Sequence, residues 1–232
     1  MEFNASKCHV LHFSGKNRQY LYHIKGTLLN SSDAERDLGV LISKDLKPSK
    51  HTKEVVRKAN QCLGMIRRSF THIDSEIFLL VYKTFIRPKL EYCSNIWSPY
   101  LLKDINLLEN VQRRATKMVI GLHALPYEER LKKLDLFSLH HRRLRGDLIL
   151  LFKIFNGLVD VKVEDFFSVK DYQRTRGHNQ KLELLRNPKT DIGHNAFSKR
   201  VIIPWNSLPN YVVNSDSVQA FKRNFDKHSK SC

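Results

Sequence analysis

Basic side chains recur along one side of a stretch with helical periodicity. Lys50, Lys53 and Arg57 fall within a narrow sector of a helical wheel drawn at about 100° per residue, and Arg68 falls in the same sector. A row of cations on one helix face can neutralise successive phosphates of a polyanion, and the counterions released from it favour binding. The apolar side chains of this stretch cluster on the opposite side: Val55, Ala59, Cys62, Leu63 and Ile66.

A second stretch, at about residues 103–120, repeats this arrangement. Arg113, Arg114 and Lys117 point away from its apolar face. Solvated charge is normal on any surface helix, but a purely solvated face would carry mixed signs. Residues 44–68 hold eight basic residues and only two acids. We therefore predict that Lys50, Lys53 and Arg57, and also Arg113, Arg114 and Lys117, bind nucleic acid. The apolar face of the second stretch comprises Leu107, Leu108, Val111, Ala115, Met118 and Val119.

Catalytic signatures are not recognisable in the chain. It contains no HExxH, GxSxG, GxxxxGK[ST] or GxGxxG motif and no adjacent pair of aspartates. Metal-dependent phosphoryl transfer needs carboxylates that hold two cations about 4 Å apart, whereas the acids here are scattered among basic residues. His140 and His141 diverge by about 100° on a helix, which favours a solvated polar face over a metal site. We expect no catalytic residue, no metal ligand and no cofactor in this chain.

Isolated aromatic residues offer a second way to bind bases, by stacking. Trp97, Trp205 and the pair Phe166 and Phe167 have the spacing that is more typical of a packed core. We interpret them as core residues.

Composition limits the class of protein. The 232 residues include 40 Lys and Arg against 23 Asp and Glu, a formal net charge of +17 that makes a polyanion the natural partner. The four cysteines are far apart and suggest neither a zinc ribbon nor a disulfide framework. No apolar run approaches the length of a membrane span and no signal region is recognisable. We expect an intracellular protein, nuclear or cytoplasmic, with no membrane partner.

The elements that position these residues change character at about residue 50. Alternating patterns predict strands at 7–13, 20–24 and 37–42, which together form a small antiparallel sheet. After residue 50 the period is helical. Asp74 is expected to cap a helix that turns Ile77, Leu80 and Val81 inward and is broken or kinked at Pro88, followed by a helix at 90–97.

The remaining chain is also predicted to be mainly helical. A short helix begins at Tyr127, and a long one runs from the cap Ser138 to Phe155 with Gly157 as its stop. Its inward residues are expected to be Leu144, Leu148, Leu151, Phe152 and Phe155. Residues 170–194 have the composition of a basic loop or linker, and a last packed segment begins at Phe197. The fold class is therefore mainly α with a small N-terminal antiparallel β-sheet (α+β).

Several short motifs follow one another along nearly the whole chain. They are FNASKC at 3–8, ERDLGV at 35–40, KAN at 58–60, RPKLEYC at 87–93, WSP at 97–99, VQRRATK at 111–117, YEERL at 127–131, RRLRGDL at 142–148, TRGH at 175–178 and WNSLP at 205–209. In their order and spacing, these motifs resemble the end of the reverse transcriptase of jockey-like LINE (non-LTR) retrotransposons.

The resemblance implies a division into three regions. Residues 1–49 correspond to the last palm strands and the primer-grip hairpin around Leu38, Gly39 and Val40. Residues 50–160 correspond to a helical, thumb-like bundle, and residues 161–232 to a basic linker and a C-terminal packed segment. The catalytic aspartates of the family lie upstream of the motifs found here, so the chain is expected to be inactive alone, with Mg²⁺ bound only when the palm is present.

The function expected from the resemblance is to grip a primer–template duplex. The partners would be an RNA–DNA or DNA duplex and the fingers and palm of the polymerase. Two alternatives stay open. The catalytic half could be supplied by another chain, or the chain could be a helical interaction protein or a retrotransposon remnant without selected activity.

Overall fold

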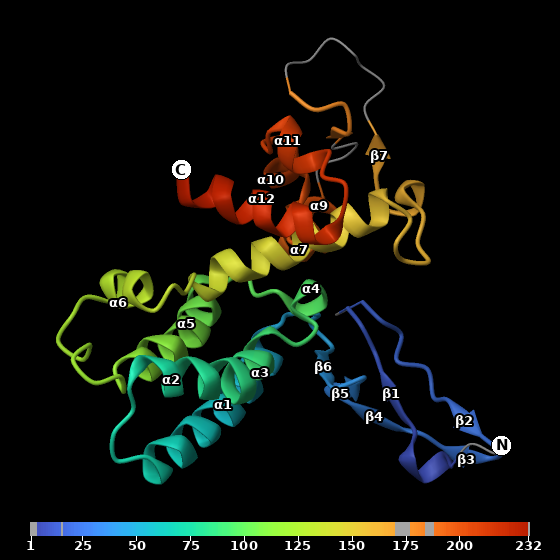
Figure 1. The fold of residues 1–232 in the computed structure, drawn as a ribbon. Coiled ribbons are helices and arrows are strands. Elements are labelled where there is room, and N and C mark those ends of the chain that lie inside the picture. Colours follow the sequence, from blue (N-terminus) through green and yellow to red (C-terminus); the bar gives the residue numbers. More distant parts are fainter. Residues whose placement is uncertain (1–3, 15, 170–176, 184–187, 232) are drawn as a thin grey trace. The chain divides into compact units, whose positions relative to one another are not determined.

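The computed structural model describes residues 4–14, 16–169, 177–183 and 188–231. The chain divides into two compact units. Unit 1 comprises Met1–Cys93 and Trp97–Leu136, and unit 2 comprises Ser94–Ile96 and Phe137–Cys232. Helices predominate, with small strand pairs near the N-terminus, so the expected mainly α, α+β class is confirmed (Figure 1). The two compact units do not coincide with the predicted boundaries at residues 49 and 160.

The strands of unit 1 are very short and form separate pairs. The prediction of one antiparallel sheet from three strands was wrong in this detail. β1 pairs with β4 in parallel, while β2 with β3 and β5 with β6 are antiparallel. The elements are the 3₁₀ turn η1 (Ala5–Lys7), β1 (His9–Leu11), β2 (His23–Ile24), β3 (Thr27–Leu28), β4 (Asn30–Ser32), β5 (Ala34–Asp37) and β6 (Val40–Ser43).

A tight hairpin replaces the strand expected at 37–42. Leu38 and Gly39, between β5 and β6, both have positive φ, +43° and +87°. Two consecutive positive φ angles are typical of the two-residue turns whose twist matches a β-hairpin. The Tyr92 hydroxyl donates a hydrogen bond of 2.9 Å to the Leu38 carbonyl. A Cβ atom at residue 39 would lie 3.2 Å from the Tyr92 ring, so both φ and space favour glycine there.

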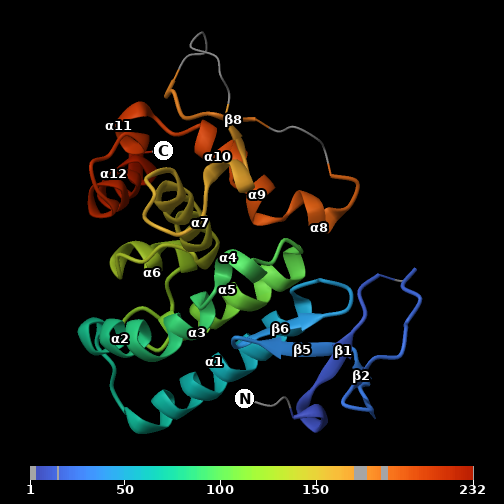
Figure 2. The same cartoon turned by 90° about the vertical axis from the view of Figure 1, so that its right-hand side faces the viewer.

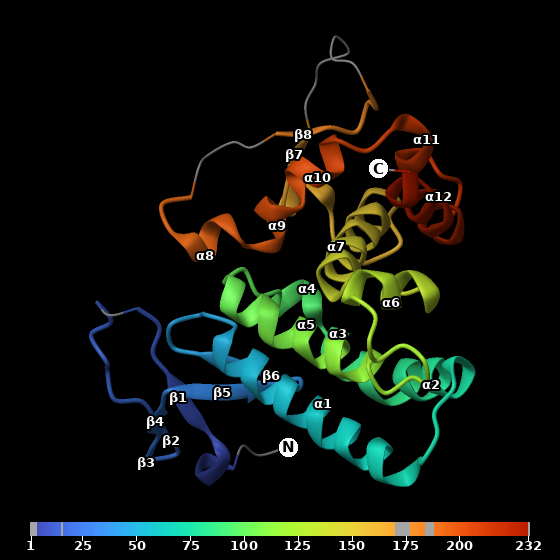
Figure 3. The same cartoon turned by 90° about the vertical axis from the view of Figure 1, so that its left-hand side faces the viewer.

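Two parallel helices form the centre of unit 1, and Figure 3 shows them side by side. α1 (Ser49–Ser69) buries Val55, Ala59 and Leu63, as its pattern predicted, and packs against α5 (Leu102–Thr116). The Ser49 hydroxyl donates to the Asp104 carboxylate at the starts of the two helices. Beyond their ends, the Ile120 amide donates to the Ile73 carbonyl at 3.0 Å. The two helices therefore run in the same direction.

For the helical segment after Asp74, the predicted start is confirmed, but the predicted buried face was wrong. The Asp74 carboxylate accepts the Ile77 amide at 2.8 Å, the expected cap. However, Ile77 and Leu80 are exposed, and Phe78, Tyr82 and Ile86 are buried. A π-helical turn lies between two α-helical segments, directly before Pro88, and it shifts the face that later residues present. The elements are α2 (Ser75–Val81), η2 (Tyr82–Ile86) and α3 (Arg87–Glu91).

The stretch from residue 90 to residue 120 differs from the prediction in two places. The helix expected at 90–97 is interrupted at Cys93, whose φ is +50°, so α4 covers only Ser94–Trp97. α5 ends at Thr116, four residues before the expected Ile120. A series of turns then leads to α6 (Tyr127–Lys133). This early end matters because the connecting loop folds back beside the last turns of α5.

Unit 2 is built around α7 (Leu139–Phe155) and α12 (Val218–Ser231), which pack together (Figure 2). The Ser138 hydroxyl accepts the His141 amide at 3.2 Å, and Gly157 has a φ of +61°, so both predicted ends of α7 are confirmed. Its core centres on Trp205, with Leu148, Leu151 and Phe221 around it. The other elements are η3 (Val163–Asp165), β7 (Ser168–Val169), β8 (Leu182–Glu183), α8 (Asp191–His194), α9 (Phe197–Arg200), α10 (Ile202–Asn206) and α11 (Asn210–Val213).

Part of the predicted basic linker at 170–194 is tightly packed. His178 is 2% exposed and its Nε2 lies 3.0 Å from the Trp205 carbonyl. The Trp205 indole donates to the Gln180 carbonyl at 2.7 Å, and Asn206 exchanges two hydrogen bonds with the backbone of Leu182. The linker prediction was therefore wrong for 177–183. Residues 170–176 and 184–187, with Thr175 and Arg176 of one motif and Phe3 of another, lie outside the described residues.

Candidate nucleic-acid interface

The predicted cationic residues of α1 are all on the surface, but their charges are not equally available. Lys50, Lys53 and Arg57 are exposed. Arg57 forms a bidentate pair with the Glu54 carboxylate, at 2.9 and 3.0 Å. Lys58 lies 3.4 Å and Arg36 3.8 Å from the same carboxylate. Glu54 is therefore the centre of a surface ion-pair network that neutralises part of the row of cations.

The electrostatics of this network agree with its geometry. Hydrogen bonds from Arg57, followed by its charge and by Lys58, lower the pKa of Glu54 to about 2. The largest cause that lowers the pKa of Asp33 is its hydrogen bond from Lys44, and for Asp45 it is the hydrogen bond from Ser43. The charge of Lys50 lowers the pKa of both carboxylates further. Among the described residues, Lys53 forms no ion pair and does not appear among the charges that shift these carboxylates, unlike Arg57 and Lys50.

A shallow groove of about 310 Å³ lies beside the β5–β6 hairpin. His51 lines it and is only 3% exposed. Its Nδ1 accepts the Leu41 amide at 3.0 Å, and its ring meets Trp97 edge-on at 4.6 Å. Burial, then the charges of Arg36 and Lys58, lower the pKa of His51 to about 4. His51 is therefore neutral at pH 7 and acts as a structural acceptor.

The predicted primer-grip residues occupy the turn of this hairpin and its second strand. Leu38 is 84% exposed, whereas Val40 is 5% exposed and lies in the core. Leu38 and Gly39 can thus contact a ligand directly, but Val40 can act only through the packing of the hairpin.

The second predicted cluster lies at the end of α5. Arg113, Arg114 and Lys117 are exposed, and none has a carboxylate of the described residues within ion-pair distance. The Arg113 guanidinium lies over the Tyr127 ring, 4.2 Å from its centroid. Together these residues line a hollow of about 770 Å³ between α5 and the loop that leads to α6.

Arg130 holds the wall of this hollow in place and was not identified from the sequence. It is 3% exposed. Its guanidinium donates to the Thr116 hydroxyl at 3.0 Å, to the Leu125 carbonyl at 2.5 Å and to the Arg113 carbonyl at 3.3 Å. These bonds tie the loop to the last turn of α5, where carbonyls lack helical partners. The YEERL motif contains Arg130, but the motif alone does not reveal which of its charges is buried.

A network of buried side-chain hydrogen bonds fixes the position of the Tyr127 hydroxyl. Its hydroxyl donates to the Glu109 carboxylate and accepts from the Gln112 amide at 2.9 Å, while the Tyr82 hydroxyl donates to the Gln112 carbonyl oxygen. Burial and the bond to Glu109 raise the pKa of Tyr127. Glu109 is buried and bonded within this hydrogen-bond network, and it is not among the residues that line the hollow.

The two predicted clusters do not form one site. Ser49 and Asp104 fix the starts of α1 and α5 next to one another. None of Lys50, Lys53 and Arg57 lines the hollow that Arg113, Arg114 and Lys117 share. The structure places two separate basic patches on unit 1.

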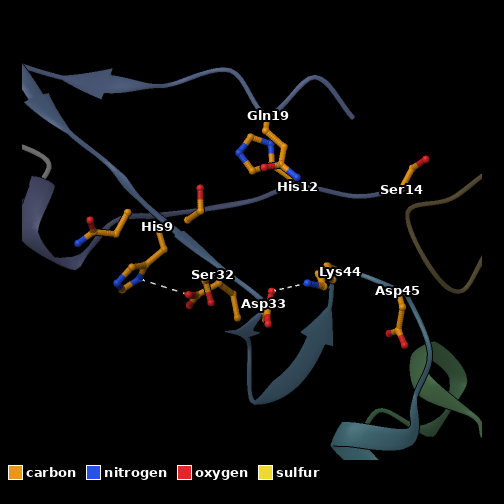
Figure 4. Close-up of a pocket in the computed structure, with 11 residues that line it drawn as sticks. His9, His12, Ser14, Gln19, Ser32, Asp33, Lys44 and Asp45 are labelled. Atoms are coloured by element: carbon orange, nitrogen blue, oxygen red, sulfur yellow. Dashed lines mark ion pairs between the residues drawn. The ribbon is translucent and has the colours of Figure 1, made fainter. Parts of the chain in front are cut away.

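A larger hollow, of about 900 Å³, lies among the short strand pairs (Figure 4). Its lining holds three carboxylates, those of Asp33, Glu35 and Asp45, against one lysine, Lys44, which lies 2.7 Å from Asp33. Within the part of the chain that the structure describes, no group of three or more His, Cys, Asp or Glu could hold a metal ion. This hollow offers a polyanion no excess of positive charge.

The aromatic residues considered for stacking are mostly in the core. Trp97, Trp205 and Phe167 are 4%, 0% and 6% exposed, as the interpretation as core residues predicted, whereas Phe166 is 51% exposed. His141 is stacked between Phe137 and Phe225, and burial lowers its pKa. This contact makes it part of the packing of unit 2.

No protein-family model matches the chain, nor does any curated protein or any solved structure. Among the described residues, no helix has both the length and the apolar character needed to cross a membrane.

Proposed function

We propose that the chain binds nucleic acid through unit 1, as the duplex-holding, C-terminal part of a non-LTR retrotransposon reverse transcriptase. The observation that carries this proposal is the cluster of Arg113, Arg114 and Lys117, which converge on one hollow without a carboxylate partner among the described residues. Exposed cations without acidic partners are those that gain most from neutralising phosphates. The motif order described above supplies the family.

The α1 patch supports the same function more weakly. Lys53 is exposed and without an ion pair in the described structure, whereas Arg57 already holds Glu54. Binding through α1 would therefore depend on Lys50 and Lys53 more than on Arg57. In the proposed complex the backbone of an RNA–DNA or DNA duplex lies against these side chains, and such contacts carry no base specificity.

Catalysis in the proposed assembly comes from the fingers and palm of the polymerase, with their magnesium ions. The residues of this chain would position the duplex and would not touch the reacting atoms. Primer extension should consequently require addition of a palm-containing fragment. Extension by this chain alone would contradict this part of the proposal.

The test of binding compares three triple variants that lose the same number of charges. In the first, Arg113, Arg114 and Lys117 are changed to Gln; in the second, Lys50, Lys53 and Arg57 are changed. The matched control changes Lys16, Lys189 and Arg223, which are exposed and scattered over the chain. Binding to a labelled duplex is measured by fluorescence anisotropy at low salt.

We expect the α5 variant to lose affinity at least tenfold, and the α1 variant to lose less, because its Arg57 is already paired. The control should lose less than threefold. Each lost phosphate contact should also reduce the slope of log K against log salt by about 0.9. Equal losses in all three variants would show that only bulk charge matters, and would contradict the proposed interface.

A further inference from the structure

The hollow between α5 and α6 has two unlike walls. One wall is a single face of α5, because residues 107, 110, 113, 114 and 117 are spaced by three or four positions. The other wall is the loop His123–Pro126 with the first turn of α6, visible in Figure 3 as the connection from α5 to α6. The first wall is cationic, and the second is largely apolar through Ala124, Leu125 and Pro126.

The cations of the helix wall are arranged to act together. The Arg113 guanidinium lies over the Tyr127 ring, and the Arg114 Nε donates to the Asn110 carbonyl at 3.3 Å. Lys117 completes the set one turn further on. The hollow is held by the hydrogen bonds of the buried Arg130 side chain, although its lining residues are mostly exposed. None of the residues that line it is acidic.

Basic residues at a helix C-terminus also have a simpler explanation. They interact favourably with the helix dipole, and at the surface each such contact contributes about 0.3–1 kcal/mol. That explanation requires neither a hollow nor an apolar wall opposite the cations. Here both are present, and the volume of about 770 Å³ falls in the range of small-molecule sites.

Size and chemistry restrict the occupant. A hollow of this volume is too small to enclose a duplex, whose backbone can only lie across its open side, whereas one nucleotide fits inside it. Three convergent cations suit a phosphomonoester, which carries about −1.5 to −2 charges at pH 7. Inorganic phosphate would leave the apolar wall without a partner, while a sugar and base would cover it.

We propose that this hollow binds a single nucleotide bearing a terminal phosphomonoester, with its phosphate on Arg113, Arg114 and Lys117 and its sugar and base against the loop. The choice of a nucleotide as ligand rests on the proposed function. Such a nucleotide has two sources, a free nucleoside monophosphate or the phosphorylated end of a strand.

The test uses the full-length chain and adenosine 5′-monophosphate as the probe, with adenosine and inorganic phosphate for comparison. We expect the monophosphate to bind at least tenfold more tightly than either. The change of both Arg114 and Lys117 to Gln should weaken its binding at least tenfold. The matched control changes Lys132 and Lys133 of α6 to Gln, two exposed cations outside the hollow, and should weaken it less than twofold.

A second variant separates loss of binding from loss of folding. Asn110→Asp places a carboxylate in the helix wall, one turn from Arg113 and Arg114. Such pairs at i,i+3 and i,i+4 stabilise a helix, so the variant should fold at least as well as the wild type. Its affinity for the monophosphate should nevertheless fall at least fivefold, because the new carboxylate competes with the phosphate.

Competition with oligonucleotides distinguishes the two sources. If a single strand with a 5′-phosphate binds more tightly than both the monophosphate and the same strand with a 5′-hydroxyl, the ligand is a strand end. If the free monophosphate binds as tightly as the phosphorylated strand, the ligand is a free nucleotide. Either result supports the hollow as a nucleotide site.

Three results would overturn the proposal: equal affinity for adenosine and its monophosphate, inorganic phosphate binding as tightly as the monophosphate, or equal losses in the two double variants. The change of Lys50, Lys53 and Arg57 to Gln should leave monophosphate binding unchanged. Failure of duplex binding with intact monophosphate binding would therefore reject the duplex function alone.

Discussion

The two units carry nearly the same surplus of charge but use their basic residues differently. Unit 1 has 23 basic and 14 acidic residues, a net charge of +9, and unit 2 has 17 and 9, a net charge of +8. In unit 2, Arg145 holds Asp226 at 2.5 and 2.7 Å, and Arg200 holds Asp147 at 2.8 and 2.9 Å. In unit 1 the cluster at the end of α5 has no such partner among the described residues. Net charge alone therefore does not locate a binding surface.

The largest expected effect is on the stability of unit 2, through the ion pair between Asp147 and Arg200. Asp147 is 3% exposed and accepts from Arg200 and, at 2.8 Å, from Asn95. Asp147→Ala should reduce the free energy of unfolding of unit 2 by about 3 kcal/mol, because it leaves a largely buried guanidinium without its counter-charge. The chain has one tryptophan in each unit, so Trp205 fluorescence during denaturant unfolding reports on this change.

Asp160→Ala is the matched control, because Asp160 is exposed. It should change stability by less than about 0.5 kcal/mol. Nucleic-acid binding should be the same in both variants. A loss of less than about 1 kcal/mol in Asp147→Ala would show that Arg200 is not a structural arginine, and would remove the contrast between the units.

The next effect is the acid sensitivity of unit 1. The pKa of His51 is about 4 in the folded protein, below the 6.5 expected when it is unfolded. As pH falls from 6.5 to 4 the unfolded chain takes up the proton first, so stability is lost across this window. The shift corresponds to roughly 3 kcal/mol. Unfolding followed by the fluorescence of Trp97, which contacts His51, measures it.

His51→Asn keeps an acceptor near the position of Nδ1 but removes the titrating ring. The variant should be less stable at pH 7 and should lose most of the pH dependence that Trp97 reports. An unchanged pH profile would show that another group is responsible.

The smallest expected effect is on duplex binding through the cations of α1, which Glu54 partly neutralises. Glu54→Gln releases Arg57 and Lys58 from their shared carboxylate, so the affinity for duplex should rise two- to threefold at low salt. Glu76→Gln, which makes the same change in net charge at an exposed residue of α2, should have a smaller effect. If both variants bind equally tightly, the ion-pair network of Glu54 does not limit binding through α1.

Periodicity predicted the fold class, the start of α2 at Asp74 and both ends of α7, because caps and apolar spacing act locally. Its predictions were wrong where contacts between residues far apart in the sequence determine the local structure. The buried face after Asp74 is formed by Phe78 and Tyr82, and the Tyr82 hydroxyl donates to Gln112, thirty residues away. The hairpin at Leu38 and Gly39 depends in part on Tyr92, more than fifty residues away.

For the candidate site, the sequence predicted which cations lie on the surface but not which of them have partners. All the predicted cations of α1 and α5 are on the surface. The pattern could not show that Arg57 is paired with Glu54, or that Arg130 is buried, because charges look alike in a sequence whether they face solvent or a carbonyl. The hollow arises only because α5 ends early and its loop folds back.

The salt dependence of duplex binding tests the central claim most directly. The affinity of the wild-type chain and of the variant with Gln at positions 113, 114 and 117 is measured from 50 to 200 mM salt. We predict a steep linear dependence for the wild type, and a slope reduced by about 2–3 in the variant, since each phosphate contact contributes about 0.9. Identical slopes for the two proteins, or no measurable binding of the wild type at 50 mM salt, would contradict the assignment of the α5 cluster to nucleic acid.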